Sequence, residues 1–182
     1  MTRLRTASKQ NRKSKTDALF ICADELESSG NLRGAFRLFL TAAKLGDSGC
    51  QVNVGNYYCD GIGIRRNLTA GLYWYKRAYR RGDVSAASNI GMTWRNEGNQ
   101  KRALSWFRRA VKMGDDEANL DIAQYYLGNK NDPRKAIPHL ERVCRSIRVT
   151  TACAAEAAKL LKHARKNLEQ YEKGITPSRR RL

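Results

Sequence analysis

The sequence is poor in the features that strands, membrane spans and metal sites require. It has only three prolines in 182 residues and little of the apolar–polar alternation of strands, which favours helices. Its longest apolar run falls far short of the roughly 20 residues that cross a bilayer. No Cys-x-x-Cys or His-x-x-x-His spacing occurs, so neither a metal nor a cofactor is expected. With 41% hydrophobic residues the chain can still bury a continuous core, and its length suggests one domain.

The five cysteines argue against an extracellular disulfide framework. Their number is odd, and no apolar signal-peptide core lies near Met1. Cys50 and Cys59 are expected on one helix, where a rise of about 1.5 Å per residue places them roughly 13 Å apart, too far for a disulfide. We therefore predict free thiols in a reducing compartment and a cytoplasmic protein.

Acidic residues are scarce, because 17 Asp and Glu stand against 35 Lys and Arg, for a net charge of +18. Residues 1–15 carry six basic residues and no acid, and residues 159–182 carry eight basic and two acidic residues. Two thirds of the excess charge therefore lies near the ends of the chain. Such ends can keep a protein soluble, contact nucleic acid or the ribosome, or bind an acidic protein. The acid-free N-terminal stretch also has the composition of an organelle transit peptide, but it lacks the apolar face of one.

What the sequence does contain is a repeat. Three runs of the form Ala-x-x-x-Φ-x-x-Ala, where Φ is aromatic and Gly71 replaces one Ala, each end in a Gly-Asp pair. The pairs begin at Gly46, Gly82 and Gly114, which gives spacings of 36 and 32 residues. Such spacings are typical of a helix–turn–helix unit that stacks into a solenoid.

Each Gly-Asp pair is predicted to separate two helices. The Gly suits the position after a helix C-terminus, and the Asp suits the cap of the next helix. The first helices of successive units then align Gly55, Gly91 and Ala123. We expect these small residues to let the partner helix approach closely, which offsets the roughly 1 kcal/mol that a mid-helix Gly costs.

Further units extend the pattern in both directions. Residues 18–26 and 32–45 form an earlier pair, and Pro133 opens a later second helix that Pro138 is expected to distort. The last helical stretch has one apolar stripe and would cap the solenoid. The predicted organisation is a basic disordered tail over 1–16, tandem repeats over 17–148, a capping helix over 149–173 and a basic tail over 174–182.

One unit carries a recognisable motif in residues 58–78. After Tyr58 come the loop glycines Gly61 and Gly63, then Asn67, and then Trp74. This stretch resembles the Sel-one-like repeat, a relative of the tetratricopeptide repeat, with Asn67 where an Asp is usual.

The resemblance covers roughly residues 17–148, and the units around Gly30 and Gly98 are similar to plain tetratricopeptide units. It implies an all-α fold: a right-handed α-solenoid of about four helix-pair repeats plus a C-terminal capping helix. It also implies protein–protein interaction, as an adaptor or as an inhibitor of another protein, of the immunity type among others.

The first helices are expected to line the concave face. Polar residues recur there and could hydrogen-bond an extended peptide or a partner helix, or be ordinary exposed residues. The candidate protein-binding residues are Asp24, Asn53, Asn56, Asn89, Met92, Asp121 and Gln124.

The second helices carry basic stripes. A cation in the last turn of a helix gains about 0.3–1 kcal/mol from the helix dipole, so these residues can be structural. They are also the best electrostatic patch for an acidic partner or a nucleic acid. The patch comprises Lys76, Arg77, Arg80, Arg81, Arg108, Arg109 and Lys112.

No set of acid, base and nucleophile emerges, so no catalytic residue is predicted. His139 and His163 lie far apart in the repeat order. His139 takes the position that Trp74 and Trp106 hold in other units, so we expect a packed or half-buried His and two core tryptophans. The turn at Gly61 lacks the Lys-Ser/Thr of a phosphate loop.

The sequence thus predicts a non-enzymatic scaffold, adaptor or inhibitor that binds another protein, expected to be acidic, through the solenoid groove, without a membrane. The alternative is a nucleic-acid- or ribosome-associated helical-repeat protein that uses its basic tails and stripes. No repeat, however, carries the regular base-reading residue pair of modules that bind one base per repeat.

Overall fold

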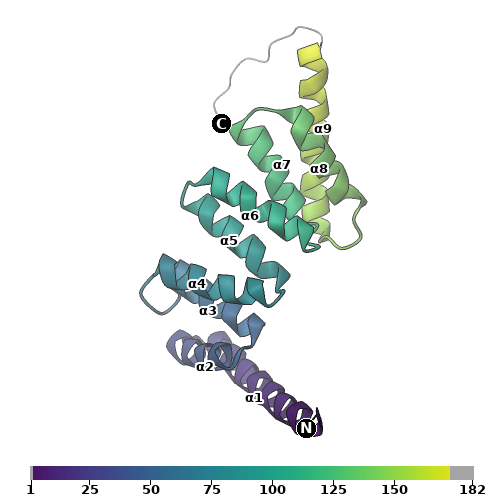
Figure 1. Cartoon of the computed structure of the whole chain (residues 1–182). Helices are drawn as coiled ribbons and strands as arrows, with labels where there is room; N and C mark the ends of the chain where they lie inside the picture. Colours follow the sequence, from purple (N-terminus) through teal and green to yellow (C-terminus); the bar gives the residue numbers. More distant parts are fainter. Residues whose placement is uncertain (1, 173–182) are drawn as a thin grey trace. The chain divides into compact units, whose positions relative to one another are not determined.

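The computed structural model describes residues 2–172, and every regular element in that range is an α-helix (Figure 1), which confirms the all-α prediction. The helices are α1 (Thr2–Ser28), α2 (Leu32–Leu45), α3 (Ser48–Asp60), α4 (Leu68–Arg80), α5 (Val84–Asn96), α6 (Gln100–Lys112), α7 (Ala118–Asn129), α8 (Pro133–Arg145) and α9 (Thr151–Glu172).

The chain divides into two compact units, Met1–Thr93 (unit 1) and Trp94–Leu182 (unit 2). Unit 1 holds α1 to α4 and most of α5, and unit 2 holds the end of α5 and α6 to α9. Within unit 1, α1 packs on α2, α2 on α3 and α3 on α4. Within unit 2, α6 packs on α7, α7 on α8 and α8 on α9. Packing mainly between neighbours in the sequence is the pattern of a helical repeat.

The glycine of each Gly-Asp pair follows the end of a helix, as predicted. The three glycines have φ of 103°, 87° and 98°, the left-handed conformation that ends a helix. Each Asp side chain accepts a hydrogen bond from the backbone N–H three residues later, at 2.7, 3.3 and 3.2 Å. Asp47 is thereby the N-cap of α3. Helix α7 instead begins at Ala118 with Glu117 as its N-cap, so the cap predicted at Asp115 is wrong by two residues. The pairs are Gly46-Asp47, Gly82-Asp83 and Gly114-Asp115.

The second helices α2, α4 and α6 are capped by asparagine. The Oδ1 atoms of Asn31, Asn67 and Asn99 accept hydrogen bonds of 3.0 to 3.1 Å from the N–H three residues on. Asn67 stands where the repeat usually has an Asp, and it caps the N-terminus of α4 as an Asp would.

Helices α3 and α4 approach closely where glycines face a partner side chain. A Cβ at Gly55 would lie 2.4 Å from Cδ1 and Cε1 of Tyr75, and a Cβ at Gly71 would lie 2.2 Å from Sγ of Cys59. Contacts under about 3 Å do not occur for real Cβ atoms. The close approach predicted at Gly55 is therefore confirmed.

Each unit buries its own set of apolar side chains. In unit 1, Phe39 and Tyr57 are buried beside Trp74, with their rings 5.9 Å apart between centroids. In unit 2, Leu140 and Val143 of α8 are buried with alanines 157 and 164, the two buried residues of α9. Helix α9 thus buries one stripe and exposes the rest, as an end piece should.

Three features differ from the sequence expectation. Helix α1 begins at Thr2, where a disordered tail was predicted, and residues 2–15 indeed lack Gly and Pro and are rich in helix formers. Pro138 lies inside α8, a position where Pro removes a helix hydrogen bond, and Leu140 and Val143 beside it are fully buried. Trp106 is half-buried rather than core. The basic tail expected over 174–182 lies outside the described residues.

Candidate functional site

The candidate residues of the first-helix face belong to both units, so each unit is considered by itself. Asp24, Asn53, Asn56, Asn89 and Met92 lie in unit 1, whereas Asp121 and Gln124 lie in unit 2. Their role in binding stays a prediction.

In unit 1 the structure brings two of the predicted asparagines together. Asn56 Oδ1 accepts a hydrogen bond of 2.6 Å from the hydroxyl of Tyr75 and one of 3.4 Å from Nδ2 of Asn89. Both asparagines are half-buried, while Tyr75 is only 3% exposed. Gly55 makes this arrangement possible, because a side chain there would displace the Tyr75 ring. The two amides are therefore held by the core of the unit.

The other candidates in unit 1 make no such cluster. Met92 is 42% exposed and lies one turn after Asn89 on α5. Asn53 is half-buried and precedes Asn56 by one turn of α3. Asp24 is exposed on α1. Among these five candidates, Asp24 is the charged residue and Met92 the exposed apolar one.

In unit 2, Asp121 forms an ion pair with Arg95. Burial raises the pKa of Asp121 above its ordinary value, and Arg95 opposes that rise. The exposed Gln124 lines a small hollow with both residues and with Tyr125 and Asn129. Asp121 is therefore satisfied inside the protein, so Gln124 is the more available of the two candidates.

The basic residues of unit 1 follow α4 and its C-cap. Arg77 lies 5.0 Å from the ring centroid of Trp74, over a side chain that is 8% exposed, as predicted for a core tryptophan. Lys76, Arg80 and Arg81 are exposed. Helix α4 contains no acidic residue, so the charges that it carries are all positive.

The basic residues of unit 2 lie on α6. Arg108 donates a hydrogen bond of 2.7 Å to the hydroxyl of Tyr126, and Arg109 lies 4.3 Å from the ring centroid of Trp106. This guanidinium covers Trp106, which therefore does not need full burial. Lys112 is exposed at the end of the helix.

His139 is half-buried, as predicted. Its Nδ1 lies 2.9 Å from Oδ1 of Asn119, and its ring stacks on Tyr126 with centroids 6.2 Å apart. Burial first, and then the charges of Arg142 and Arg108, lower the pKa of His139. The imidazole is therefore a packed, neutral group beside two arginines.

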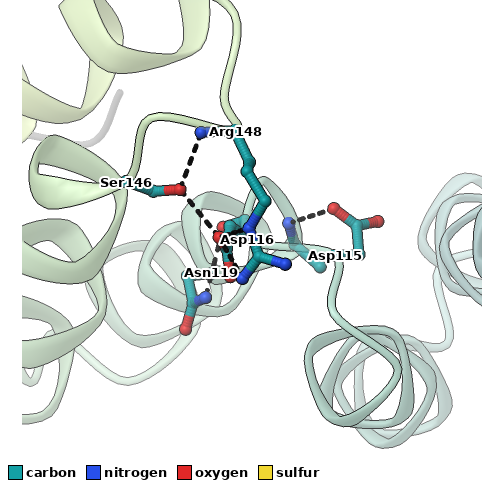
Figure 2. A network of polar contacts seen from close by, with 6 residues as sticks. Asp115, Asp116, Asn119, Ser146 and Arg148 are labelled. Atoms are coloured by element: carbon teal, nitrogen blue, oxygen red, sulfur yellow. Dashed lines mark hydrogen bonds and ion pairs between the residues drawn. The ribbon is translucent and has the colours of Figure 1, made fainter.

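Sequence reasoning missed a polar network in unit 2, shown in Figure 2. Asp116 accepts a hydrogen bond of 2.7 Å from Ser146 and one of 3.0 Å from Nε of Arg148, and it forms an ion pair of 3.0 Å with Nη2 of the same arginine. The network joins the α6–α7 connection to the α8–α9 connection. Ile147, between the two anchored residues, is 99% exposed. The signal was the Asp115-Asp116 doublet, since the other Gly-Asp pairs have a single acid.

The described residues contain no group of three or more His, Cys, Asp or Glu placed to hold a metal ion. All five cysteines are free thiols, as predicted. Among the helices of residues 2–172, none combines the length and apolar character of a membrane span.

Comparison with known proteins gave one family and several solved structures. The family described as Sel1 repeat matches residues 27–47, 48–83 and 95–115. A Sel1 repeat protein from Oxalobacter formigenes is 26% identical with a TM-score of 0.57, over 89% of this chain and 64% of that one. The chain therefore spans less than two thirds of that protein. No curated protein sequence matches the chain.

Two further structures show the fold alone. The protective antigen c5321 of uropathogenic Escherichia coli, which displays an SLR fold, is 22% identical with a TM-score of 0.57, over 72% of this chain and 28% of that one. The MamA protein is 16% identical with a TM-score of 0.58, over 93% of this chain and 98% of that one.

Proposed function

Because the chain is a helical-repeat protein of the Sel1 type, and Sel1 repeats generally mediate protein–protein interaction, we propose that it binds an extended segment of another protein. The binding surface is the first-helix face of unit 1, centred on Asn56 and Asn89. The protein acts as an adaptor or as an inhibitor of that partner.

The observation that supports this proposal is that two polar atoms of the Asn56–Asn89 pair make no hydrogen bond within residues 2–172. Asn56 Oδ1 is occupied by Tyr75 and by Asn89 Nδ2, but Asn56 Nδ2 and Asn89 Oδ1 have no partner within residues 2–172. The pair therefore offers a donor and an acceptor side by side. A peptide group carries the complementary acceptor and donor, so an extended backbone can satisfy both amides.

Two properties of this surface suit a protein ligand. The hydroxyl of Tyr75 holds Asn56 in place, which reduces the side-chain entropy that binding would otherwise cost. Met92 adds an exposed apolar side chain one turn away, and methionine adapts its shape to varied partners.

Contact with nucleic acid or the ribosome remains the alternative, favoured by the charge of the second helices. Together α2, α4 and α6 carry eleven Lys and Arg and no acidic residue. Phosphate contacts of this kind weaken steeply with salt.

The test is capture of the partner from a native extract by the full chain, followed by mass spectrometry and by binding measurements with the purified partner. Asn56→Ala/Asn89→Ala should weaken binding about tenfold or more, since two hydrogen bonds at about 0.5–1.5 kcal/mol each are lost. The exposed Asn11→Ala serves as a matched control and should bind as the unaltered protein does.

Tyr75→Phe separates contact from stability, because it removes the internal hydrogen bond but keeps both amides. It should lower stability and weaken binding less than the double Asn variant does, because the pre-ordering of Asn56 is lost but both amides remain. Equal binding by the unaltered chain and the double Asn variant would disprove the proposed surface. Loss of the partner on nuclease treatment would instead support the nucleic-acid alternative.

A further inference from the structure

Helix α6 in unit 2 carries five cations and no carboxylate. Four of the cations line a hollow on one stripe of the helix. The remaining lining is a serine hydroxyl and a leucine that is 9% exposed. We call this surface the α6 hollow, and its residues are Lys101, Leu104, Ser105, Arg108, Arg109 and Lys112.

The four cations of the α6 hollow form no ion pair within residues 2–172. Three acids of unit 2, Asp116, Asp121 and Glu141, are instead held by arginines outside the hollow. No carboxylate of the described chain therefore pairs directly with these four cations. An external anion can.

Two of the guanidinium groups are positioned before any ligand arrives. Arg108 is fixed by its 2.7 Å hydrogen bond to the hydroxyl of Tyr126, and Arg109 by its stacking 4.3 Å from the ring centroid of Trp106. Exposed ion pairs are usually weak because two long side chains must be ordered. Here the two arginine side chains are already ordered in the free protein, so binding loses less side-chain entropy.

The aromatic rings of the site indicate which anion fits. Proteins that bind single-stranded nucleic acid stack bases on free aromatic faces. Here Arg109 covers Trp106. Over Tyr126 lie the ring of His139, with the two centroids 6.2 Å apart, and Nζ of Lys135, 5.9 Å from the Tyr126 centroid. Both rings are therefore in contact with side chains of the protein itself, and Leu104 is the apolar residue of the lining that a ligand can contact. A peptide that combines carboxylates with an apolar side chain matches this lining better than a phosphate backbone does.

The length of the stripe agrees with a peptide ligand. From Lys101 to Lys112 the helix rises about 17 Å, the length of three turns of a second helix. Glutamates one turn apart on such a helix would meet the cations in succession.

We propose that the α6 hollow binds a carboxylate-rich segment of a partner protein, with Arg108 and Arg109 as the residues that hold its carboxylates. This inference rests on the proposed protein-binding function and adds a contact surface in unit 2 that is separate from the amide pair of unit 1. It also assigns the partner an acidic segment with an apolar side chain.

The experiment measures binding of the full chain to a synthetic helical peptide with about four glutamates around a leucine. An oligothymidylate of the same net charge is measured in parallel. The peptide should bind more tightly than the oligothymidylate, and its affinity should fall as salt is raised. Arg108→Gln/Arg109→Gln should weaken peptide binding at least about fivefold, because both pre-positioned ion pairs are lost.

The matched control is Lys162→Gln/Lys166→Gln, which removes the same two charges from exposed positions on α9. It should change the affinity by less than about twofold, because the lost charges lie outside the hollow. Ser105→Glu places a negative charge in the hollow at an exposed position, and should abolish binding whereas Ser105→Ala does not. Circular dichroism checks that each variant keeps its helices.

His139 provides an internal reporter, because the charge of Arg108 contributes to its lowered pKa. Bound carboxylates offset that charge, so the peptide should raise the pKa of His139 in an NMR titration. Arg108→Gln should raise it without peptide and remove the further response. The inference is overturned if the peptide fails to bind, if the oligothymidylate binds as tightly, or if the α9 control loses as much affinity. None of these results depends on Asn56 or Asn89, so the proposed site on unit 1 and the α6 hollow can be disproved independently.

Discussion

Replacing Gly55 by Ala is the sharpest test of how the unit 1 site is built. The added Cβ would lie 2.4 Å from two ring carbons of Tyr75, about 1 Å closer than an ordinary van der Waals contact. Tyr75 is 3% exposed, and its hydroxyl is held 2.6 Å from Asn56 Oδ1. The ring therefore cannot swing into solvent, and α3 and α4 must move apart.

The magnitude follows from two opposing terms. Overpacking of a filled core costs about 1–3 kcal/mol. Ala has a higher helix propensity than a mid-helix Gly, which stabilises the helix by up to about 1 kcal/mol. We therefore expect Gly55→Ala to lower the free energy of unfolding by about 1–2 kcal/mol, measured by urea unfolding. Hydrogen exchange should place the lost protection in α3 and α4.

Gly128→Ala is the matched control. Gly128 lies near the end of α7, and a Cβ there meets no atom within 4 Å. The same substitution should therefore leave stability unchanged or raise it by up to about 1 kcal/mol. The two variants carry the same substitution, yet Gly55→Ala should lower the free energy of unfolding and Gly128→Ala should leave it unchanged or raise it.

A double-mutant cycle identifies the clash. Tyr75→Leu lowers stability by itself, but Gly55→Ala in that background should cost little, because the ring that it strikes is gone. The reasoning is refuted if Gly55→Ala is as stable as the unaltered protein, or if its cost is the same with and without the Tyr75 ring.

Three further predictions concern caps, an ion pair and thiols. Asp47→Ala should cost about 1 kcal/mol in urea unfolding, and Asp47→Ser much less, since Ser can still cap α3; equal losses would exclude capping as the cause. Arg95→Gln should lower stability by about 1–2 kcal/mol at neutral pH and less at about pH 4. The pKa of Asp121, already raised by burial, rises further without Arg95, so the penalty of its charged form is present above that pKa and disappears as pH falls through it. A penalty independent of pH would contradict this account. In the folded protein, a thiol reagent followed by mass spectrometry should label the exposed Cys22 before Cys59, whose pKa is raised by burial; the reverse order would show that α3 opens readily.

Local features of the fold were predictable because their causes lie within a few residues. Gly46-Asp47 ends one helix and caps the next through contacts between residues at most five apart. The small residue at Gly55 indicated close packing before its partner was known. Helix α1 was misjudged over residues 2–16, because a run of positive charge suggested disorder although the residues themselves favour a helix.

The candidate site was predictable only in part. Asn56 and Asn89 were selected by their repeat positions, but the hydroxyl that fixes them belongs to Tyr75 on another helix. Asp121 was selected in the same way, yet its charge is used by Arg95 inside unit 2. A repeat alignment identifies residues on a common face, but it contains no information about which of them are already hydrogen-bonded.

By itself the sequence determined the helices, their caps and their pairing, since each depends on short-range geometry and on the period of the apolar residues. Only the tertiary structure decided which polar groups remain available. Among residues 2–172, it left one donor and one acceptor free on Asn56 and Asn89. In the same range, four cations of α6 have no carboxylate partner, while Asp116, Asp121 and Glu141 are paired elsewhere. Hydrogen bonds and ion pairs between side chains depend on contacts between residues far apart in the sequence. Those contacts exist only after the helices have packed.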